Sequence, residues 1–419
     1  MKSAFLTTWR GLWRGKTLWT LLAAVAAFYF LLPGLVRSDG TEAGALEMEV
    51  RIVCGAVFAL ACTVSLAIGS GMLAREREEE LLPLSLVRPS SAFSLAAGRW
   101  LAVVLLFFFV FFENAVLMNA MLRKGDAPLP DCRVHIAPAL PPAEVSAALA
   151  MDAFLKCDST PAAVKKSPRS AVLALLAAKE NERYEVVRPG QSASWPFSGV
   201  PSGPLSVKVR FSTMYGMKMP LDGVFRFKCA EGVVSNSTQS VIEVPLAVCG
   251  TQGQDVSGGE TLSFTNTGKS DVMLRPRRDI ELLSPGDPFW ANSIRASVEM
   301  LALTGLLAAF GLFLSSALSR PVALFVAAVL FAASMTAPDA VSQFPDEFNA
   351  TLGEKAGLAI SRAVVAFTSA FSGVSPVSDV ASGRAIPCDS LFRTVLMDLA
   401  VLPGFLLGLS ALVLRRKAK

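Results

Sequence analysis

Histidine and charged residues are scarce in this chain, and their scarcity excludes several classes of protein. The 419 residues include one histidine, His135, and only 17% are charged, whereas a soluble globular protein has about 25% charged residues. No GxxxxGK[ST], HExxH or GxSxG pattern occurs, so the usual groups for binding nucleotide phosphates or for hydrolysis are missing. We therefore expect no enzymatic activity in the chain itself, although a membrane enzyme that uses carboxylates alone is left open.

Metal ligands are scarce as well. Cys132 and His135 have a spacing that occurs in metal sites, but two ligands do not make a zinc site. We expect this chain to hold no metal and no cofactor.

Apolar residues, in contrast, are abundant. They make up 53% of the chain, and the mean hydropathy is +0.50. This composition indicates an integral membrane protein surrounded by a lipid bilayer. The net charge of +5 does not indicate binding to nucleic acid, because the basic residues lie beside apolar runs and form no single stripe.

Six apolar segments have a length suited to crossing a bilayer, which takes about 20 residues in a helix. We therefore expect an α-helical polytopic membrane protein with six transmembrane helices. The fifth segment is short because Pro338 follows it. The predicted spans are 17–36, 52–73, 100–121, 293–317, 321–337 and 394–414.

Lysine and arginine flank these spans on alternate sides. By the positive-inside rule, both termini face the cytoplasm, and we expect a multi-pass protein of the bacterial cytoplasmic (inner) membrane. Within residues 1–16, one helical face carries Phe5, Trp9 and Trp13, which predicts a cytoplasmic helix lying in the membrane interface. An ordinary aromatic and basic flank is the alternative.

A large insertion, residues 122–292, separates the third span from the fourth and is the size of a domain. Residues 143–182 have apolar side chains at helical spacing. Residues 184–290 instead contain short runs rich in Val, Ile, Phe and Thr between Gly and Ser clusters. This pattern is typical of an antiparallel β-sandwich, so we expect an extracytoplasmic, mainly-β domain inserted between the spans.

Residues 338–393 form the second expected extracytoplasmic segment. An apolar stretch at 354–373 has helical character, but Lys355 and Arg362 interrupt it. We therefore expect a short re-entrant or interfacial helix there, not a further span. Residues 394–419 then provide the sixth helix and a basic cytoplasmic tail.

Four cysteines lie in the large insertion, where an oxidising compartment permits disulfides. They are Cys132, Cys157, Cys229 and Cys249. Four cysteines allow three pairings, and the sequence cannot choose among them. The local pairs, Cys132 with Cys157 and Cys229 with Cys249, are our preference.

Polar groups inside the spans are candidates for function, because they are costly to hold in lipid. Glu113 and Asn114 interrupt a very apolar run in the third span, and Glu299 and Asp398 occur in the fourth and sixth. The three carboxylates lie at similar depths in the outer half of the bilayer, so they are translocation-path candidates that could line the mouth of a cavity. The alternative is that each faces the headgroups or pairs with a neighbour such as Arg295.

The connection between the second and third spans, residues 74–99, combines charges with leucines. A charged run follows the second span directly, and Arg88-Pro89 precedes the next apolar run at Gly98. This mixture suits a protein interface with a wet rim. The residues expected to dock are Arg75, Glu76, Arg77, Glu78, Glu79, Leu82, Leu84, Leu86, Arg88 and Pro89.

This connection resembles the cytoplasmic loop of ABC-2-type transporter permeases, the membrane subunits of bacterial ABC exporters. The family pattern, roughly E-R-E-x-G-T-L-E-x-L-L-x-R-P-x-S, aligns without gaps from Glu76. The chain departs from it at Glu80, Leu81, Pro83 and Ser85. Pro83 lacks a backbone donor, which suits the start of a docking helix better than its interior.

The resemblance implies a dimer, with a second copy or a paralogue, in which each permease contacts one cytoplasmic ABC ATPase. That ATPase would bind the ATP and Mg²⁺, and the 75–91 hairpin would transmit its motion to the spans, so that a lipid, glycan, peptide or drug-like substrate is exported. The insertion lies outside the minimal family pattern, and an extracytoplasmic protein is a further expected partner. The alternative is a non-transporting membrane anchor or force-transmitting subunit that moves or recruits such a partner.

Overall fold

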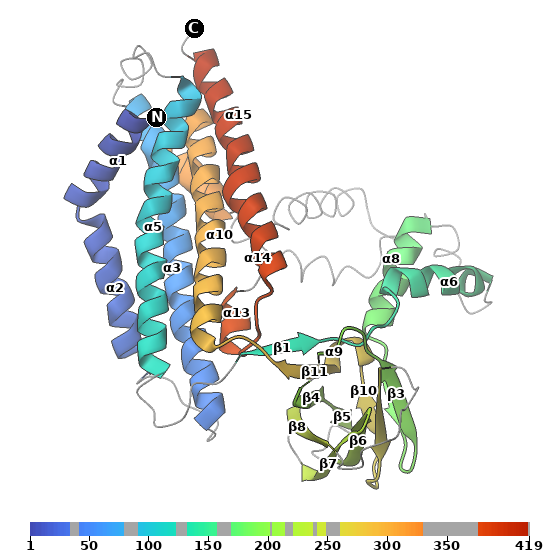
Figure 1. Cartoon of the computed structure of the whole chain (residues 1–419). Coiled ribbons are helices and arrows are strands. Elements are labelled where there is room, and N and C mark those ends of the chain that lie inside the picture. The colour runs from blue at the N-terminus through green and yellow to red at the C-terminus, as the bar shows by residue number, and fades with distance from the viewer. Residues whose placement is uncertain are drawn as a thin grey trace. The chain divides into compact units, whose positions relative to one another are not determined.

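In the computed structural model, the chain folds into two compact units (Figure 1). The helical unit comprises Met1–Cys132, Asp287–Pro345 and Thr351–Lys419, and the inserted unit comprises Arg133–Gly286 with Asp346–Ala350. The residues that the structure describes are 1–33, 42–78, 91–122, 132–156, 169–201, 203–213, 221–237, 241–248, 260–329 and 376–417.

The helical unit is built from long apolar helices. Within the described residues, four helical stretches are long and apolar enough to cross a membrane: Glu47–Ala74, Ala92–Met121, Phe289–Ala317 and Cys388–Arg416. The elements of this unit are α1 (Lys2–Arg14), α2 (Thr17–Leu31), α3 (Glu42–Glu78), α5 (Ala92–Leu122), α10 (Phe289–Ala317), α13 (Pro376–Ala381), α14 (Cys388–Thr394), the π-helix η2 (Val395–Val401) and α15 (Leu402–Lys417).

The first and fifth predicted spans correspond to shorter apolar helices, Thr17–Leu31 and Arg320–Val329. Fifteen residues of α-helix extend about 22 Å, which is less than the hydrocarbon thickness of about 30 Å. Four helices of the described chain are therefore long and apolar enough to cross a membrane, and six spans stay a prediction. The expected helix at 354–373 lies outside the described residues.

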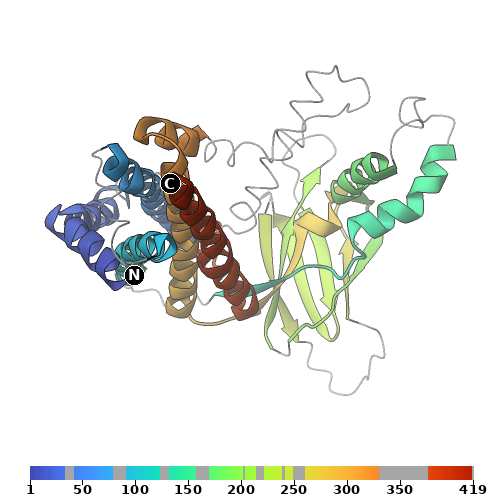
Figure 2. The same cartoon turned by 90° about the horizontal axis from the view of Figure 1, so that it is seen from above.

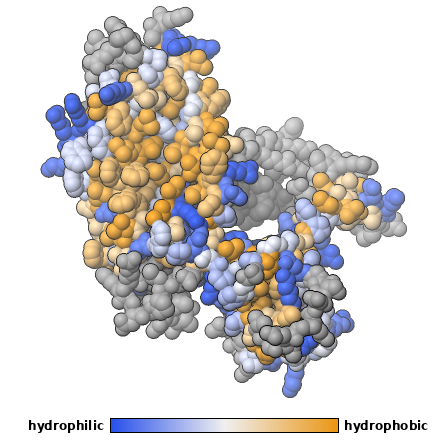
Figure 3. Space-filling view, viewed as in Figure 1, coloured by the Kyte–Doolittle hydropathy of each residue, from blue (hydrophilic) through white to orange (hydrophobic). Residues whose placement is uncertain are grey.

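The surface of the helical unit supports a membrane environment. Figure 3 shows a broad apolar area over its helices. Large apolar side chains point outward from several of them, including Phe30, Phe108, Phe112 and Phe405, the last two 60% and 63% exposed. Such an area on a water-soluble protein would favour aggregation, whereas lipid covers it without cost.

Helix α10 is the centre of this unit, and most of its side chains are buried. Its backbone accepts hydrogen bonds from two neighbours: Ser65 Oγ of α3 donates to the Thr304 carbonyl at 2.7 Å, and Trp100 Nε1 of α5 donates to the Gly305 carbonyl at 2.8 Å. Gly69 of α3 and Gly311 of α10 make a close crossing, where a Cβ on Gly69 would lie 2.7 Å from the Ala308 oxygen. Small residues let helices approach in this way.

Both chain termini lie at the end of the helical unit where α3 ends and α5 begins (Figure 1). Leu73, Ala92 and Leu414 share one apolar cluster there. Gly98 packs on the first residue of the chain, since a Cβ at Gly98 would lie 2.6 Å from the Met1 oxygen. The connection 79–90 therefore starts and ends beside both termini.

The inserted unit departs from the opposite end of α5 and α10. At that end Asn119 Nδ2 of α5 donates to Ser293 Oγ of α10 at 2.8 Å, and Cys132 N donates to the Asp287 carbonyl at 3.2 Å. The long helices thus separate the insertion from the termini and from the 79–90 connection along the chain.

The inserted unit contains an eight-stranded antiparallel sheet in the order β1-β11-β4-β8-β7-β6-β9-β3, and a three-stranded sheet in the order β2-β10-β5. The strands are β1 (Arg133–Ile136), β2 (Glu185–Val187), β3 (Ser192–Pro196), β4 (Leu205–Arg210), β5 (Ser212–Thr213), β6 (Leu221–Phe227), β7 (Ala230–Ser237), β8 (Val241–Val248), β9 (Thr261–Asn266), β10 (Val272–Leu274) and β11 (Ile280–Pro285).

Along the strands of this sheet, buried side chains alternate with more exposed ones, as the sequence predicts. In β6 every second residue from Leu221 to Phe227 is buried, which is the pattern of a strand with one wet face. Val207, Phe225, Leu262 and Leu282, from strands along the whole sheet, pack into one apolar cluster. The large sheet therefore curls around a single core, where the sequence had predicted a sandwich.

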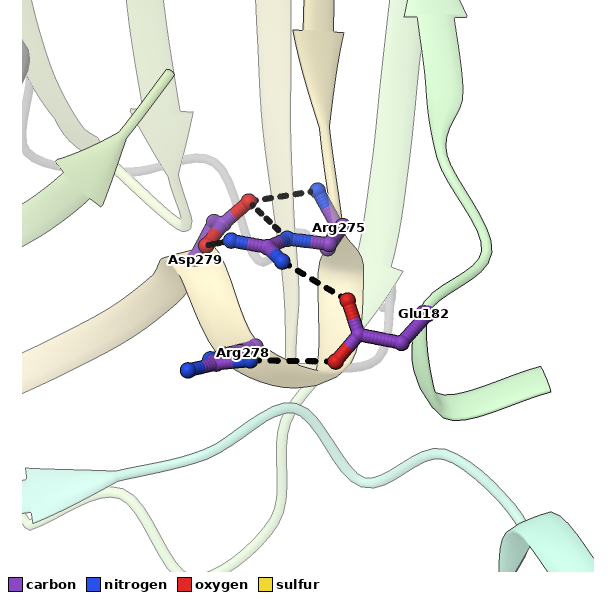
Figure 4. Close-up of polar contacts among 4 residues, drawn as sticks. All are labelled: Glu182, Arg275, Arg278 and Asp279. Carbon is purple, nitrogen blue, oxygen red and sulfur yellow. Dashed lines mark hydrogen bonds and ion pairs between the residues drawn. The ribbon is translucent and has the colours of Figure 1, made fainter. Parts of the chain in front are cut away.

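Helices α6 (Ala143–Lys156) and α8 (Arg169–Asn181) lie side by side next to this sheet (Figure 2). A polar cluster joins Glu182, which directly follows α8, to the short helix α9 (Pro276–Asp279) and Arg275 before it, as Figure 4 shows for Glu182, Arg275, Arg278 and Asp279. Arg275 contacts Asp279 at 3.0 Å and Glu182 at 2.7 Å, and Arg278 contacts Glu182 at 3.0 Å. These bonds fix the end of α8 against the turn that precedes β11.

Candidate functional site

The first group of buried polar side chains lies where α2, α3 and α5 meet. Tyr29 Oη donates to Asn114 Oδ1 at 3.0 Å and lies 3.8 Å from Cys54 Sγ. Asn114 is fully buried, and its Nδ2 has no hydrogen-bond partner among the described residues. Glu113 is half-buried and close enough to act electrostatically on Tyr29. This group connects three helices, and it leaves Asn114 Nδ2 and Glu113 Oε2 buried without a hydrogen-bond partner among the described residues.

The second group forms a stripe on α10. Asn292, Arg295 and Glu299 are three and four residues apart and therefore share one face of the helix. Asn292 Nδ2 donates to the Arg384 carbonyl and Asn292 Oδ1 accepts from the Ile386 N–H, both at 2.8 Å. Arg295 donates to the Ile386 carbonyl at 3.1 Å and pairs with Asp287 at 2.6 Å. Two members of the stripe thus hold the segment that leads into α14.

Glu299, the third member, has no such partner. It is 2% exposed, and its Oε2 makes no hydrogen bond within the described part of the chain. The charges that act on it are those of Asp379 in α13 and Asp398 in η2. Among the described residues Arg295 pairs with Asp287 and donates to the Ile386 carbonyl, and no ion pair joins it to Glu299.

Asp398 is 4% exposed and lies in the π-helical segment of the last membrane helix. The Leu402 N–H bonds to the Met397 carbonyl, five residues back. Pro403 follows directly and cannot donate to the Leu399 carbonyl, so a regular helical turn would lose a bond and bring the ring against that carbonyl. The wider turn accommodates the proline, and π-segments of this kind occur frequently at functional sites.

The structure thus brings together some of the predicted residues and separates others. Glu299 and Asp398 interact electrostatically, whereas Glu113 and Asn114 belong with Tyr29. Asp379 and Asn292 were missed. Asn292 could have been found, because it lies two helical turns before Glu299 on the same face; Asp379 lies in a six-residue helix, too short for periodicity to reveal its buried side.

The residues expected to dock a partner fall at the boundary of the described chain. Arg75, Glu76, Arg77 and Glu78 form the last turn of α3, which continues without a break beyond the apolar stretch ending at Ala74. Ser91 then caps α5, since its Oγ accepts from the Ser94 N–H at 3.1 Å. The other expected docking residues, Glu79, Leu82, Leu84, Leu86, Arg88 and Pro89, lie outside the described residues.

The cysteines and the histidine give no further site. Cys132 is buried in the helical unit and Cys229 is exposed in the inserted unit; their expected partners, Cys157 and Cys249, lie outside the described residues, so the disulfides stay a prediction. His135 Nδ1 lies 2.7 Å from Glu281 Oε2. Among the described residues, no group of three His, Cys, Asp or Glu side chains could hold a metal ion.

No protein-family model, curated protein or solved structure matches this chain.

Proposed function

We propose that this chain is the permease subunit of an ATP-driven ABC-2-type transporter. A separate cytoplasmic ATPase would dock on residues 75–91 and drive the membrane helices of a dimer. The exported substrate would be a lipid, glycan, peptide or drug-like molecule. This chain would contribute the membrane path and no catalytic group.

The observation that carries the proposal is the position of the 75–91 connection. It joins two membrane-length helices directly, because α3 continues into Arg75–Glu78 and α5 starts immediately after Ser91. A displacement of this connection would move α3 and α5 together, and both helices pack on α10. A rigid-body movement of packed helices is an ordinary way to couple such a push to a distant site.

The ends of the helical unit also support this assignment. Its basic residues are concentrated beside the termini, as expected of a cytoplasmic side. Those within the described residues include Lys2, Arg10, Arg14, Lys16, Arg75, Arg77, Arg99, Arg320, Arg415 and Arg416, whereas Arg51, Arg295, Arg384 and Arg393 lie elsewhere in the helical unit. An ATPase docked there would act on the end of the bundle opposite the one where α5 ends and α10 begins.

Affinity purification of the full chain from its native membrane in mild detergent tests the proposal. We expect an ATPase with Walker motifs to co-elute in near-equal amount with the wild-type chain. Glu76→Lys combined with Glu79→Lys should greatly reduce this co-elution, because two acidic docking residues become basic. The matched control is Glu47→Lys with Glu49→Lys, which makes the same charge change at the other end of α3. The proposal would be contradicted if no ATPase co-eluted with the wild-type chain, or if the Glu76/Glu79 variant co-eluted with as much ATPase as the wild type.

A force-transmitting subunit is the second candidate function, and one set of contacts favours it. Asp287, the first residue of the helical unit after the insertion, pairs with Arg295, which also holds Ile386. Asn292 holds the same segment through two further bonds. A movement of α14 and η2 would therefore be passed to the point where the inserted unit is attached.

Proteoliposomes that contain the chain and its ATPase separate the two functions. An exporter moves labelled lipid or peptide across the bilayer at a rate that depends on ATP. A force-transmitting complex hydrolyses ATP without such a flux, and its inserted unit changes accessibility to protease during hydrolysis.

A further inference from the structure

Glu299 completes a stripe on α10 whose other members are fully engaged. Asn292 uses both ends of its amide, and Arg295 uses its guanidinium on a carboxylate and a carbonyl. Glu299 is as deeply buried as Asn292, yet its Oε2 has no donor within the described residues. A buried carboxylate oxygen without a donor calls for an explanation, since such atoms are rare in folded proteins.

The surroundings of Glu299 are acidic. Asp379 and Asp398 act on it from α13 and η2, and the one arginine on its own helix face, Arg295, is held by Asp287. Neither Glu299 nor Asp398 forms an ion pair with a basic residue in the described part of the chain. Two buried carboxylates from two membrane helices thus lack the positive charge that normally accompanies buried acids.

We propose that Glu299 and Asp398 bind the positively charged nitrogen of a transported molecule, an ammonium or guanidinium group. The identification of this cation as cargo rests on the proposed transport function. An ammonium group presents three donors and a guanidinium group five, so carboxylate acceptors alone can satisfy them.

A resident metal ion fits this site less well. Hard cations such as Ca²⁺ need six or more oxygen ligands. Within the described ranges, the carboxylates around Glu299 do not form a group of three that could hold a metal. Leu303 and Leu306, four and seven residues after Glu299, are buried on the same face of the helix. These apolar side chains suit the hydrocarbon part of an amphiphilic cation. The substrate class is therefore a cationic amphiphile.

Binding to the purified full chain in detergent, without the ATPase, tests this inference. The probe is a dansyl-labelled alkylammonium, and the control ligand is the dansyl-labelled alcohol of equal chain length; both are titrated by fluorescence. We expect the wild-type chain to bind the cation more tightly than the alcohol. Glu299→Gln with Asp398→Asn should weaken cation binding about tenfold or more, the effect of losing a buried charged partner, and leave binding of the alcohol unchanged.

The matched control is Glu47→Gln with Asp389→Asn, which removes one glutamate and one aspartate that are not buried in the bundle. It should bind both probes as the wild type does. Equal binding of cation and alcohol by the wild type, or the same loss of cation binding in the control, would overturn the inference. Because the ATPase is absent from this assay, its outcome does not depend on the co-elution experiment. If the chain prefers the cation but no ATPase co-elutes with it, the cation site is supported and the proposed ATP-driven function is contradicted.

Discussion

At the scale of single residues, the carboxylates of this chain fall into two groups. In the inserted unit, Asp279 and Glu182 have arginine partners (Figure 4). In the helical unit, Glu299 and Asp398 have none among the described residues. The first group holds the fold together, because charge and countercharge are both present. The proposed cation site belongs to the second group, because its carboxylates have no basic partner within the described ranges.

The pKa of Glu182 yields a prediction for the first group. Hydrogen bonds from Arg275 and then Arg278 hold the pKa of Glu182 below its ordinary value. The stabilisation is therefore present above the ordinary glutamate pKa and is lost as the pH falls through the lower, folded-state pKa. Glu182→Gln should increase hydrogen exchange in α8 at pH 7, and the difference from wild type should vanish at low pH. The effect should not exceed about 1 kcal/mol, because this carboxylate is exposed.

Hydrogen exchange followed by mass spectrometry on the full chain measures this effect. Glu231→Gln is the control, because Glu231 forms an exposed ion pair with Arg226 on the sheet and not at α8. If exchange in α8 were the same in Glu182→Gln and wild type at pH 7, the cluster of Figure 4 would not fasten this helix.

At the scale of elements, the crossing of α3 and α10 determines how closely the membrane helices pack. A Cβ on Gly311 would lie 2.9 Å from the Ser70 nitrogen and 3.1 Å from the Gly69 Cα. These are backbone atoms, so neither can turn aside as a side chain would. The two helices must therefore separate if either glycine gains a side chain.

Gly311→Leu should consequently destabilise the helical unit by about 3 kcal/mol or more, beyond the usual range for overpacking because backbone must move. Thermal unfolding of the full chain in detergent measures the loss. Gly408→Leu in α15 is the matched control, because nothing lies within 4 Å of the position of its Cβ. Similar midpoints for the Gly311 variant and wild type would mean that this crossing does not limit the packing.

The sequence predicted the elements better than their connections. The long apolar helices and the alternating strands follow from the periodicity of apolar side chains, which can be read from a short window of sequence. The curl of the sheet depends on contacts between distant strands, as where the Phe264 ring of β9 covers Gly223 of β6. Likewise, the Glu299–Asp398 interaction arises from the packing of two helices about 100 residues apart in sequence, which no local pattern specifies.

At the scale of the whole molecule, the membrane helices separate the insertion from the termini along the chain. If the bundle spans the membrane as proposed, residues 133–286 lie on the side opposite the 75–91 connection. Ser192 in β3 and Ser3 in α1 are exposed positions that report on the two sides. In a background without native cysteines, Ser192→Cys should react with an impermeant maleimide in intact cells. Ser3→Cys should react only after cell disruption. Labelling of both positions in intact cells would exclude this arrangement.

The central claim is that a cytoplasmic ATPase acts on the helices through residues 75–91, and site-specific photo-crosslinking in living cells tests it most directly. A photoreactive amino acid replaces Ser85 within the connection, and Ser192 in the inserted unit serves as the control position. We predict that the crosslinked product from position 85 contains an ATPase with Walker motifs and that the product from position 192 does not. A chain that is membrane-inserted but gives no ATPase crosslink from position 85 would contradict the claim.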